Sequence, residues 1–236
     1  MRISHPANLA PAQSFVPELL LAAQGVRVVF FDVDGVLIHP RGYKEAMRLS
    51  VDHFAAEMGL PPVGITDEEI AAFEACSLTN ERDTVPMCVG ALLGGALAER
   101  PDLVRPTLRE TLAAVRAAQV RAGRPDVAAI ARQARASTPD GGPPTPAIHA
   151  LLRARTVEAA HPLLAEMLDD IYSTGSPTTF VFQHYALGSR RFEQTYGQPA
   201  AFEAESTLAR YDRPLLREDL RERLLARVEQ PGWGAA

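Results

Sequence analysis

One apolar run stands out near the start of the chain. Residues 26–31 read Val-Arg-Val-Val-Phe-Phe, which is rich in β-branched and aromatic side chains. The run lacks the period-two alternation of a half-exposed strand, which indicates a strand covered on both faces, as in a parallel sheet. Gly35 marks the turn that leads out of this strand.

From about residue 41 the apolar positions follow a helical period. The first helix has one apolar face, whose members are spaced four, three and four residues apart: Met47, Val51, Phe54 and Met58. Gly59 and the prolines that follow it end this helix. Thr66 with Glu69, and Thr107 with Glu110, have the spacing of capping boxes, and each pair predicts the start of a further helix.

The remainder of the chain continues mainly as helix. Helices are predicted over residues 126–136, 147–155, 157–172 and 217–229. Residues 137–146 are rich in proline and glycine and predict a loop within one helical region. Residues 178–185 fit either a strand or a helix by local propensity.

The composition excludes several classes of function. A net charge of -5 gives no reason to expect nucleic-acid binding. The apolar stretch at residues 15–23 contains Pro17 and Glu18 and is too short to span a bilayer, and no secretory signal is evident. We therefore expect a cytoplasmic protein that does not enter a membrane. Cys76 and Cys88, without a nearby histidine, predict buried thiols rather than a disulfide framework or a zinc site.

The chemistry is concentrated where the predicted strand ends. Asp32 and Asp34 follow the apolar run, and Gly35 comes directly after them. A turn at this point can bring the second carboxylate over the first, so that one attacks an electrophile and the other gives or takes a proton. Facing carboxylates repel one another and usually need a cation, most often Mg²⁺. The simplest alternative is that both aspartates only cap a turn.

The string Phe-Asp-Val-Asp-Gly-Val-Leu at residues 31–37 resembles the first motif of the haloacid dehalogenase superfamily. The resemblance implies a phosphatase-type hydrolase in which Asp32 is the nucleophile that forms an aspartyl-phosphate, and Asp34 is the general acid and then the base. It also implies Mg²⁺ held by the Asp32 carboxylate and the Asp34 main-chain carbonyl. The substrate implied is a small phosphorylated metabolite.

The residues after the motif resemble the subclass of this family (IA-like) that carries a helical cap after the first strand. Two segments are similar to cap segments of family members, at residues 73–83 and 188–197. Because a cap closes over the site and reads the substrate, the resemblance makes Asn80, Arg82 and Asp83 candidate substrate contacts. Helix caps and surface pairs account for these three residues equally well. Arg190 and Arg191 fit a solvated helix end better than a phosphate contact.

Three further motifs of the family are missing from the positions where the resemblance requires them. The only lysine, Lys44, lies at the start of the expected cap. Asp169 and Asp170 have the letters of the family's acidic pair but fit a solvated helix surface better. Thr138 lies in a loop and follows no strand. The sequence thus stops where a second core strand would begin, and we expect little or no activity of this chain alone.

These observations predict an α/β fold with an incomplete, haloacid-dehalogenase-like Rossmannoid core and a large all-helical cap, mostly α in this chain. The expected division is a first core strand and nucleophile loop at 1–40, a cap at 41–205, and a returning core helix with the start of the second strand at 206–236. Two functions follow. One is a Mg²⁺-dependent phosphohydrolase, and the other is a non-catalytic helical binding module that keeps a relic nucleophile loop. The oligomeric state stays open.

Overall fold

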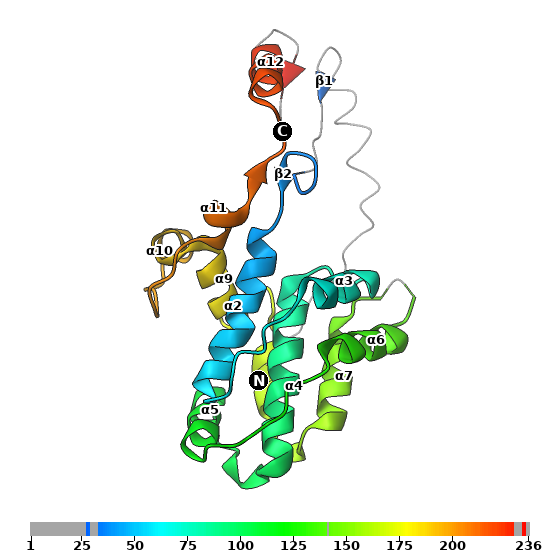
Figure 1. Cartoon of the computed structure of the whole chain (residues 1–236), viewed down its shortest axis with the longest axis vertical. Coiled ribbons are helices and arrows are strands. Elements are labelled where there is room, and N and C mark those ends of the chain that lie inside the picture. The colour runs from blue at the N-terminus through cyan, green and yellow to red at the C-terminus, as the bar shows by residue number, and fades with distance from the viewer. Residues whose placement is uncertain (1–26, 29–32, 141, 229–232, 235–236) are drawn as a thin grey trace, which may run out of the picture. The chain divides into compact units, whose positions relative to one another are not determined.

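The computed structural model describes residues 27–28, 33–140, 142–228 and 233–234 and divides the chain into two units. The terminal unit consists of Met1–His39 and Arg213–Ala236, and the helical unit consists of Pro40–Asp212. The division falls one residue before the first expected boundary and seven residues after the second. The described part is mostly helical, as predicted, and an α/β core is not present within it (Figure 1).

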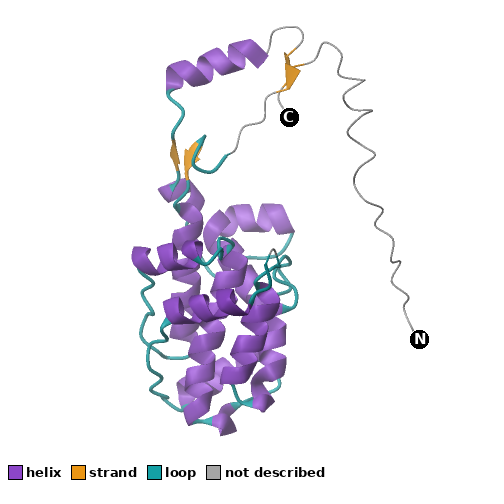
Figure 2. Ribbon diagram, turned by 90° about the vertical axis from the view of Figure 1, so that its right-hand side faces the viewer, coloured by secondary structure: helices purple, strands orange, loops and turns teal. Residues whose placement is uncertain are grey.

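In its described residues, the terminal unit contains two short ladders and one helix. Its elements are β1 (Arg27–Val28), β2 (Ile38–His39), β3 (Arg213–Pro214), α12 (Glu218–Val228) and β4 (Trp233–Gly234). β1 pairs with β4 in parallel, with Arg27 opposite Trp233. β2 pairs with β3 antiparallel, and the two arrows lie side by side in Figure 2. Both ladders join residues close to opposite ends of the chain.

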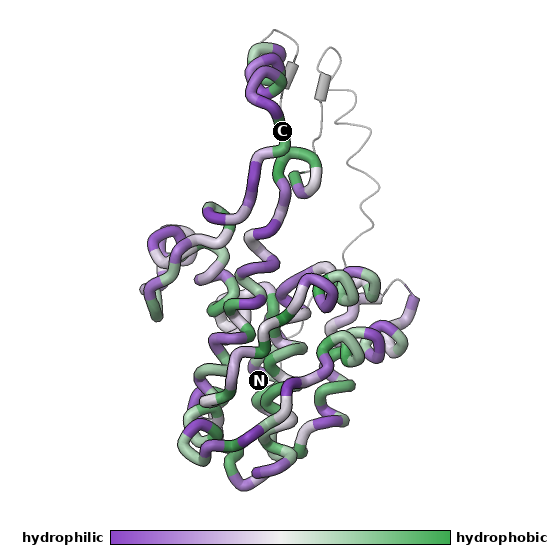
Figure 3. The backbone as a smooth tube through the Cα atoms, in the orientation of Figure 1, coloured by the Kyte–Doolittle hydropathy of each residue, from purple (hydrophilic) through white to green (hydrophobic). Residues whose placement is uncertain are grey.

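Helix α12 agrees with the helix predicted over residues 217–229. Figure 3 shows it as largely hydrophilic, and Leu220 and Leu225 are exposed. Arg217, just before the helix, pairs with Asp219 in its first turn. Acidic side chains in the first turn stabilise a helix through the positive end of its dipole.

The helical unit contains ten α-helices in its described residues. They are α2 (Gly42–Glu57), α3 (Asp67–Ala75), α4 (Glu81–Glu99), α5 (Leu108–Ala117), α6 (Val127–Ser137), α7 (Thr145–Arg155), α8 (His161–Leu168), α9 (Pro177–Leu187), α10 (Ser189–Tyr196) and α11 (Thr207–Tyr211). Two short 3₁₀ turns, at Pro101–Leu103 and Glu158–Ala160, connect some of them. Within the described residues, none of the helices combines the length and the apolar character needed to cross a membrane.

Helix α4 lies at the centre of the core, and the pattern of apolar positions did not predict it. It packs against α2, α7, α8 and α9, so its buried side chains point in every direction rather than to one face. Its fully buried apolar residues include Val85, Met87, Val89, Leu93 and Leu97. A helix covered all round has no amphipathic period, which is why the pattern did not reveal it.

Small residues let α4 approach its neighbours closely. A Cβ atom on Gly90 would lie 2.7 Å from Leu152 Cδ1, and one on Gly94 would lie 2.8 Å from Thr156 Oγ1.

Cys76 and Cys88 are free and buried, which confirms the prediction for the two thiols. Burial raises the pKa of the Cys88 thiol, so this group stays protonated in the core.

The first predicted capping box is confirmed and the second is half formed. Thr66 Oγ1 accepts from Glu69 N at 3.2 Å, and the Glu69 side chain accepts from Thr66 N at 3.0 Å. Thr107 Oγ1 accepts from Glu110 N at 3.3 Å, but the reciprocal bond is not among those of the described residues.

The structure resolves one open prediction and changes another. Residues 178–185 are helical, within α9, because Pro177 presets the first helical position and apolar side chains are buried on several faces. The helix predicted over 157–172 is interrupted: a 3₁₀ turn precedes α8, and α8 ends at Leu168. Pro162 lacks an N–H group, so α8 starts anew beside it.

Candidate functional site

Asp34 lies on a tight turn that follows β1 in the sequence. Leu37 N and Ile38 N donate to the Val33 carbonyl at 2.9 and 3.0 Å, and Gly35 N donates to the Ile38 carbonyl at 2.8 Å. Gly35 has a φ of 77°, in the left-handed region that favours glycine. Asp32 lies outside the described residues.

The turn leaves the oxygens of Asp34 available. The three bonds that close it use neither the carboxylate nor the main-chain carbonyl of Asp34, and the residue is exposed. Carboxylate and carbonyl oxygens are the donors that Mg²⁺ prefers. Among the described residues, no three or more His, Cys, Asp or Glu side chains come together as metal ligands. The predicted Mg²⁺ site at Asp32 and Asp34 therefore stays a prediction.

Asn80 and Arg82, two of the predicted substrate contacts, lie together around an exposed tyrosine in the helical unit. Asn80 caps α4, and its Oδ1 accepts from Arg82 N at 3.1 Å while its Nδ2 donates to the Tyr172 hydroxyl at 3.4 Å. The Arg82 guanidinium carbon lies 5.7 Å from the centre of the Tyr172 ring. Asn80 therefore acts as a helix cap, one of the two roles considered for it from the sequence.

Asp83, the third predicted contact, has different surroundings. It is 4% exposed, and its Oδ1 accepts from the Thr145 hydroxyl at 2.5 Å. Burial raises the pKa of the Asp83 carboxyl, because its charged form is poorly solvated there, and the Thr145 hydrogen bond offsets part of this effect. Asp83 therefore joins α4 to the start of α7 rather than facing solvent.

We expect Asp83→Asn to raise the stability of the helical unit at pH 7 and to leave it nearly unchanged at pH 3. The pKa of the Asp83 carboxyl is about 3.8 in the unfolded chain and higher in the folded protein. The folded state therefore loses stability as the pH rises from the unfolded pKa through the folded pKa, because the buried group must then ionise. Asparagine keeps an acceptor for Thr145 and carries no charge. Urea denaturation at both pH values measures the difference, and a variant that is less stable at pH 7 would contradict it.

The matched control is Asp102→Asn at the surface. The Arg100 guanidinium bonds to the Asp102 carboxyl and lowers its pKa, so this charge favours the folded state. We therefore expect the opposite sign of effect at pH 7, or no measurable change, since exposed pairs contribute little.

The other residues considered from the sequence lie away from any shared site. Lys44 pairs with Glu74 at 2.6 Å. Asp169 is exposed and follows the last residue of α8, so it lies in the turn after the helix rather than on the helix surface. Its Oδ1 lies 3.7 Å from His149 Nδ1. Further exposed or terminal positions are Arg190 and Arg191 on α10 and Thr138 at the end of α6.

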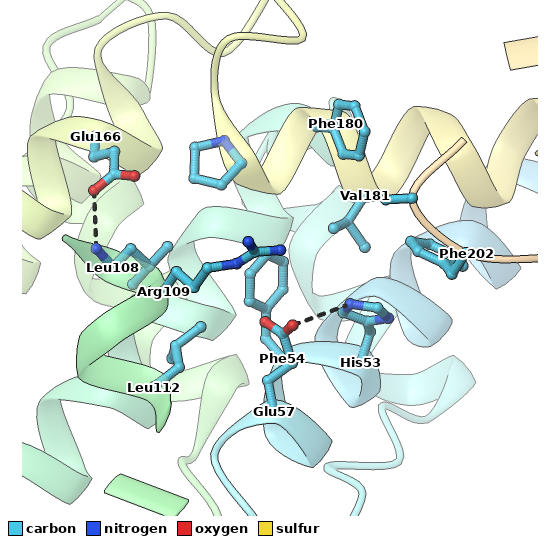
Figure 4. Close-up of a pocket in the computed structure, with 12 residues that line it drawn as sticks. His53, Phe54, Glu57, Leu108, Arg109, Leu112, Glu166, Phe180, Val181 and Phe202 are labelled. Carbon is cyan, nitrogen blue, oxygen red and sulfur yellow. Dashed lines mark hydrogen bonds and ion pairs between the residues drawn. The ribbon is translucent and has the colours of Figure 1, made fainter. Parts of the chain in front are cut away.

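A pocket of about 270 Å³ in the helical unit was not predicted from the sequence (Figure 4). Helices α2, α5, α8 and α9 and the segment at 201–202 line it. Its apolar wall includes Phe54, Leu108, Leu112, Phe180, Val181 and Phe202. Its polar members are His53, Glu57, Arg109 and Glu166. These residues are distant in sequence and form no motif, so only the fold brings them together.

His53 lies at one end of this pocket among aromatic rings. Its ring centre lies 4.8 Å from that of Phe202, and its Nδ1 lies 3.2 Å from the Tyr185 hydroxyl. Its Nε2 lies 3.8 Å from Glu57 Oε1. Burial lowers the pKa of His53, and Glu57 offsets part of that decrease. The imidazole is therefore neutral near pH 7.

Comparison with models of known families, with curated proteins and with solved structures found no match to this chain.

Proposed function

We propose that this protein is a Mg²⁺-dependent phosphohydrolase of the haloacid dehalogenase type that acts on a small phosphorylated metabolite. The observation that carries the proposal is the closed turn at residues 33–38, which presents Asp34 and its unused oxygens just after the strand-forming run. A ligand approaches a backbone of this kind most closely beside a glycine, and Gly35 occupies that position.

The pairing of β1 with β4 supports an α/β arrangement around this turn. The two strands are parallel, although nearly the whole chain lies between them. Parallel strands need a long crossover connection, and the helical unit lies within that connection. In open α/β sheets, ligands bind beyond the carboxyl ends of the strands, which is where the Asp32–Asp34 motif follows β1 in sequence.

The roles proposed for the two aspartates balance in two steps. The Asp32 carboxylate attacks phosphorus, the bond to the substrate oxygen breaks, and the Asp34 carboxyl gives its proton to the leaving oxygen. Water then attacks the aspartyl-phosphate, Asp34 accepts a proton from it, and inorganic phosphate leaves with the Asp32 carboxylate restored. Mg²⁺ held by Asp32 and the Asp34 carbonyl would neutralise charge on the phosphoryl oxygens.

The rate is expected to be low. The only lysine of the sequence, Lys44, belongs to the helical unit and is paired with Glu74. Loss of one preorganised donor to a developing negative charge costs about 2.7–4 kcal/mol, or roughly 10²–10³ in kcat. A test that depends only on turnover would therefore be weak, and binding of a phosphoryl mimic gives a better readout.

Beryllofluoride, a mimic of a phosphoryl group on a carboxylate, should form a Mg²⁺-dependent adduct at Asp32. We expect bound signals in ¹⁹F NMR with Mg²⁺, none after its removal with EDTA, and none in Asp32→Asn. Any hydrolysis of p-nitrophenyl phosphate should also fall to background in Asp32→Asn. Asp140→Asn, an exposed aspartate in the helical unit, is the control and should leave the adduct unchanged.

Two results would overturn the proposal. One is the absence of a bound ¹⁹F signal in the unsubstituted protein at millimolar Mg²⁺, and the other is a signal that persists in Asp32→Asn. Either result would favour the second function, a non-catalytic helical binding module. The observation that supports this alternative is the helical unit itself, which has its own core and its own pocket.

A further inference from the structure

We propose that the pocket between α2, α5, α8 and α9 binds a free α-amino acid with a bulky apolar side chain. All residues that line the pocket belong to the helical unit. The inference therefore does not depend on Asp32 or Asp34, and it assigns a binding site separate from the phosphohydrolase proposed above.

The inner wall of the pocket suits an apolar side chain. Phe54, Leu108 and Leu112 are at most 3% exposed and form part of the packed core. Phe180 and Phe202 add aromatic faces from α9 and from the segment after α10. A volume of about 270 Å³ is below the usual range for drug-sized ligands, roughly 300–1,000 Å³, and so favours a small molecule.

Arg109 supplies the positive charge of the pocket. The Arg109 side chain is exposed, and within the part of the chain that the structure describes its guanidinium has no ion-pair partner and no hydrogen-bond partner. Figure 4 shows its side chain projecting toward the ring of Phe54. A guanidinium offers paired donors that match a carboxylate. The ligand therefore needs a carboxylate at this end.

Glu57 supplies a negative charge on the neighbouring helix. Its nearest cationic candidate is His53, at 3.8 Å, and that imidazole is neutral near pH 7. Glu57 follows Phe54 by three residues on α2 and lines the same pocket (Figure 4). Glu166 is less available, because its Oε2 already accepts from Leu108 N at 3.1 Å. Glu57 is thus placed to receive an ammonium group.

Together the three features define one chemical class. A simple fatty or aromatic acid would satisfy Arg109 and would meet Glu57 with a like charge. An amine would satisfy Glu57 and leave Arg109 without an anion. An α-amino acid carries both charges next to one another, and its side chain can lie against Phe54, Phe180 and Phe202. Charge complementarity of this kind gives specificity as well as affinity.

Isothermal titration calorimetry with L-phenylalanine and L-leucine tests the proposal directly. Three probes remove one feature each: N-acetyl-L-phenylalanine lacks the ammonium, L-phenylalaninamide lacks the carboxylate, and glycine lacks the side chain. We expect L-phenylalanine or L-leucine to bind and each altered probe to bind at least about tenfold more weakly. The two blocked probes each lose a hydrogen bond to a charged group, and glycine loses the apolar contact. Glycyl-L-phenylalanine distinguishes a free amino acid from a peptide end.

Variants locate the site. Arg109→Gln and Glu57→Gln each change an exposed side chain and should weaken L-phenylalanine binding about tenfold or more without changing the circular dichroism spectrum. Arg132→Gln is the matched control, an exposed helical arginine on α6 that does not line the pocket. It should bind as the unsubstituted protein does.

Several outcomes would overturn the inference. They are no heat of binding with either amino acid at millimolar concentration, binding of N-acetyl-L-phenylalanine or L-phenylalaninamide as tight as that of L-phenylalanine, and binding unaffected by Arg109→Gln. Asp32 is not among the residues that line the pocket, so we expect Asp32→Asn to bind L-phenylalanine as the unsubstituted protein does. Amino-acid binding can therefore be tested separately from the phosphohydrolase proposal.

Discussion

Replacing Gly188 by alanine is expected to destabilise the helical unit by about 3 kcal/mol. Gly188 joins α9 to α10 with φ 75° and ψ 157°, a combination that is essentially restricted to glycine. A Cβ atom there would also lie 2.6 Å from the backbone nitrogen of Ser206 and 3.2 Å from the Ala204 carbonyl oxygen. Backbone atoms cannot move away as the end of a flexible side chain can. The steric collision therefore adds to the conformational strain in the cost of the substitution.

The surrounding bonds explain why relaxation is limited. Ser189 Oγ donates to the Phe202 carbonyl at 2.9 Å and accepts from Ala204 N at 2.8 Å. Ser206 Oγ donates to the Ala186 carbonyl at 2.8 Å. These bonds hold the segment after α10 against the junction of α9 and α10. A shift that makes room for a methyl group would break some of them.

Urea denaturation followed by circular dichroism at 222 nm measures the loss. Gly197→Ala is the matched control, because Gly197 also has a positive φ, 63°, but a Cβ atom there would meet nothing within 4 Å. It should cost only about 1–2 kcal/mol, the price of a left-handed alanine. Equal losses in the two variants would show that the collision with Ser206 contributes nothing.

Local signals in the sequence predicted the helix starts and the turn well. Thr66 and Glu69 form a complete capping box because both partners lie within one helical turn and need no tertiary contact. Gly35 adopts the positive φ that a tight turn requires, and the turn forms after the predicted strand-forming run. Such features depend on neighbours in sequence, so a pattern can reveal them.

The parts that were missed depend on tertiary structure. Helix α4 has no polar face, because other helices surround it, and its glycines and Pro86 argue against a helix by propensity alone. From its sequence position Asp83 was a candidate substrate contact or a helix-cap or surface-pair residue, and its burial beside Thr145 follows only from the packing of α4 on α7. The pocket combines His53 with Arg109 and Phe202, which no spacing rule connects.

Replacing Phe73 by alanine is expected to destabilise the helical unit by about 3–5 kcal/mol, the usual cost of removing a buried phenylalanine. Phe73 is 1% exposed, and only it and Ile70 are buried among the nine residues of α3. With Met47 and Leu78 it borders a void of only about 20 Å³, so the site is closely packed. The ring therefore provides much of what holds α3 against its neighbours.

Loss of this anchor should be detectable at a specific thiol. Cys76 ends α3 and is 8% exposed, whereas Cys88 lies in α4 and is fully buried. We expect Phe73→Ala to speed the reaction of Cys76 with Ellman's reagent at least about tenfold, and to leave Cys88 protected until global unfolding. Mass mapping of the labelled peptides distinguishes the two thiols. Phe73→Leu, which keeps most of the volume, should cost less than about 1.5 kcal/mol. Unchanged reactivity of Cys76 in Phe73→Ala would mean that contacts other than this ring hold α3 in place.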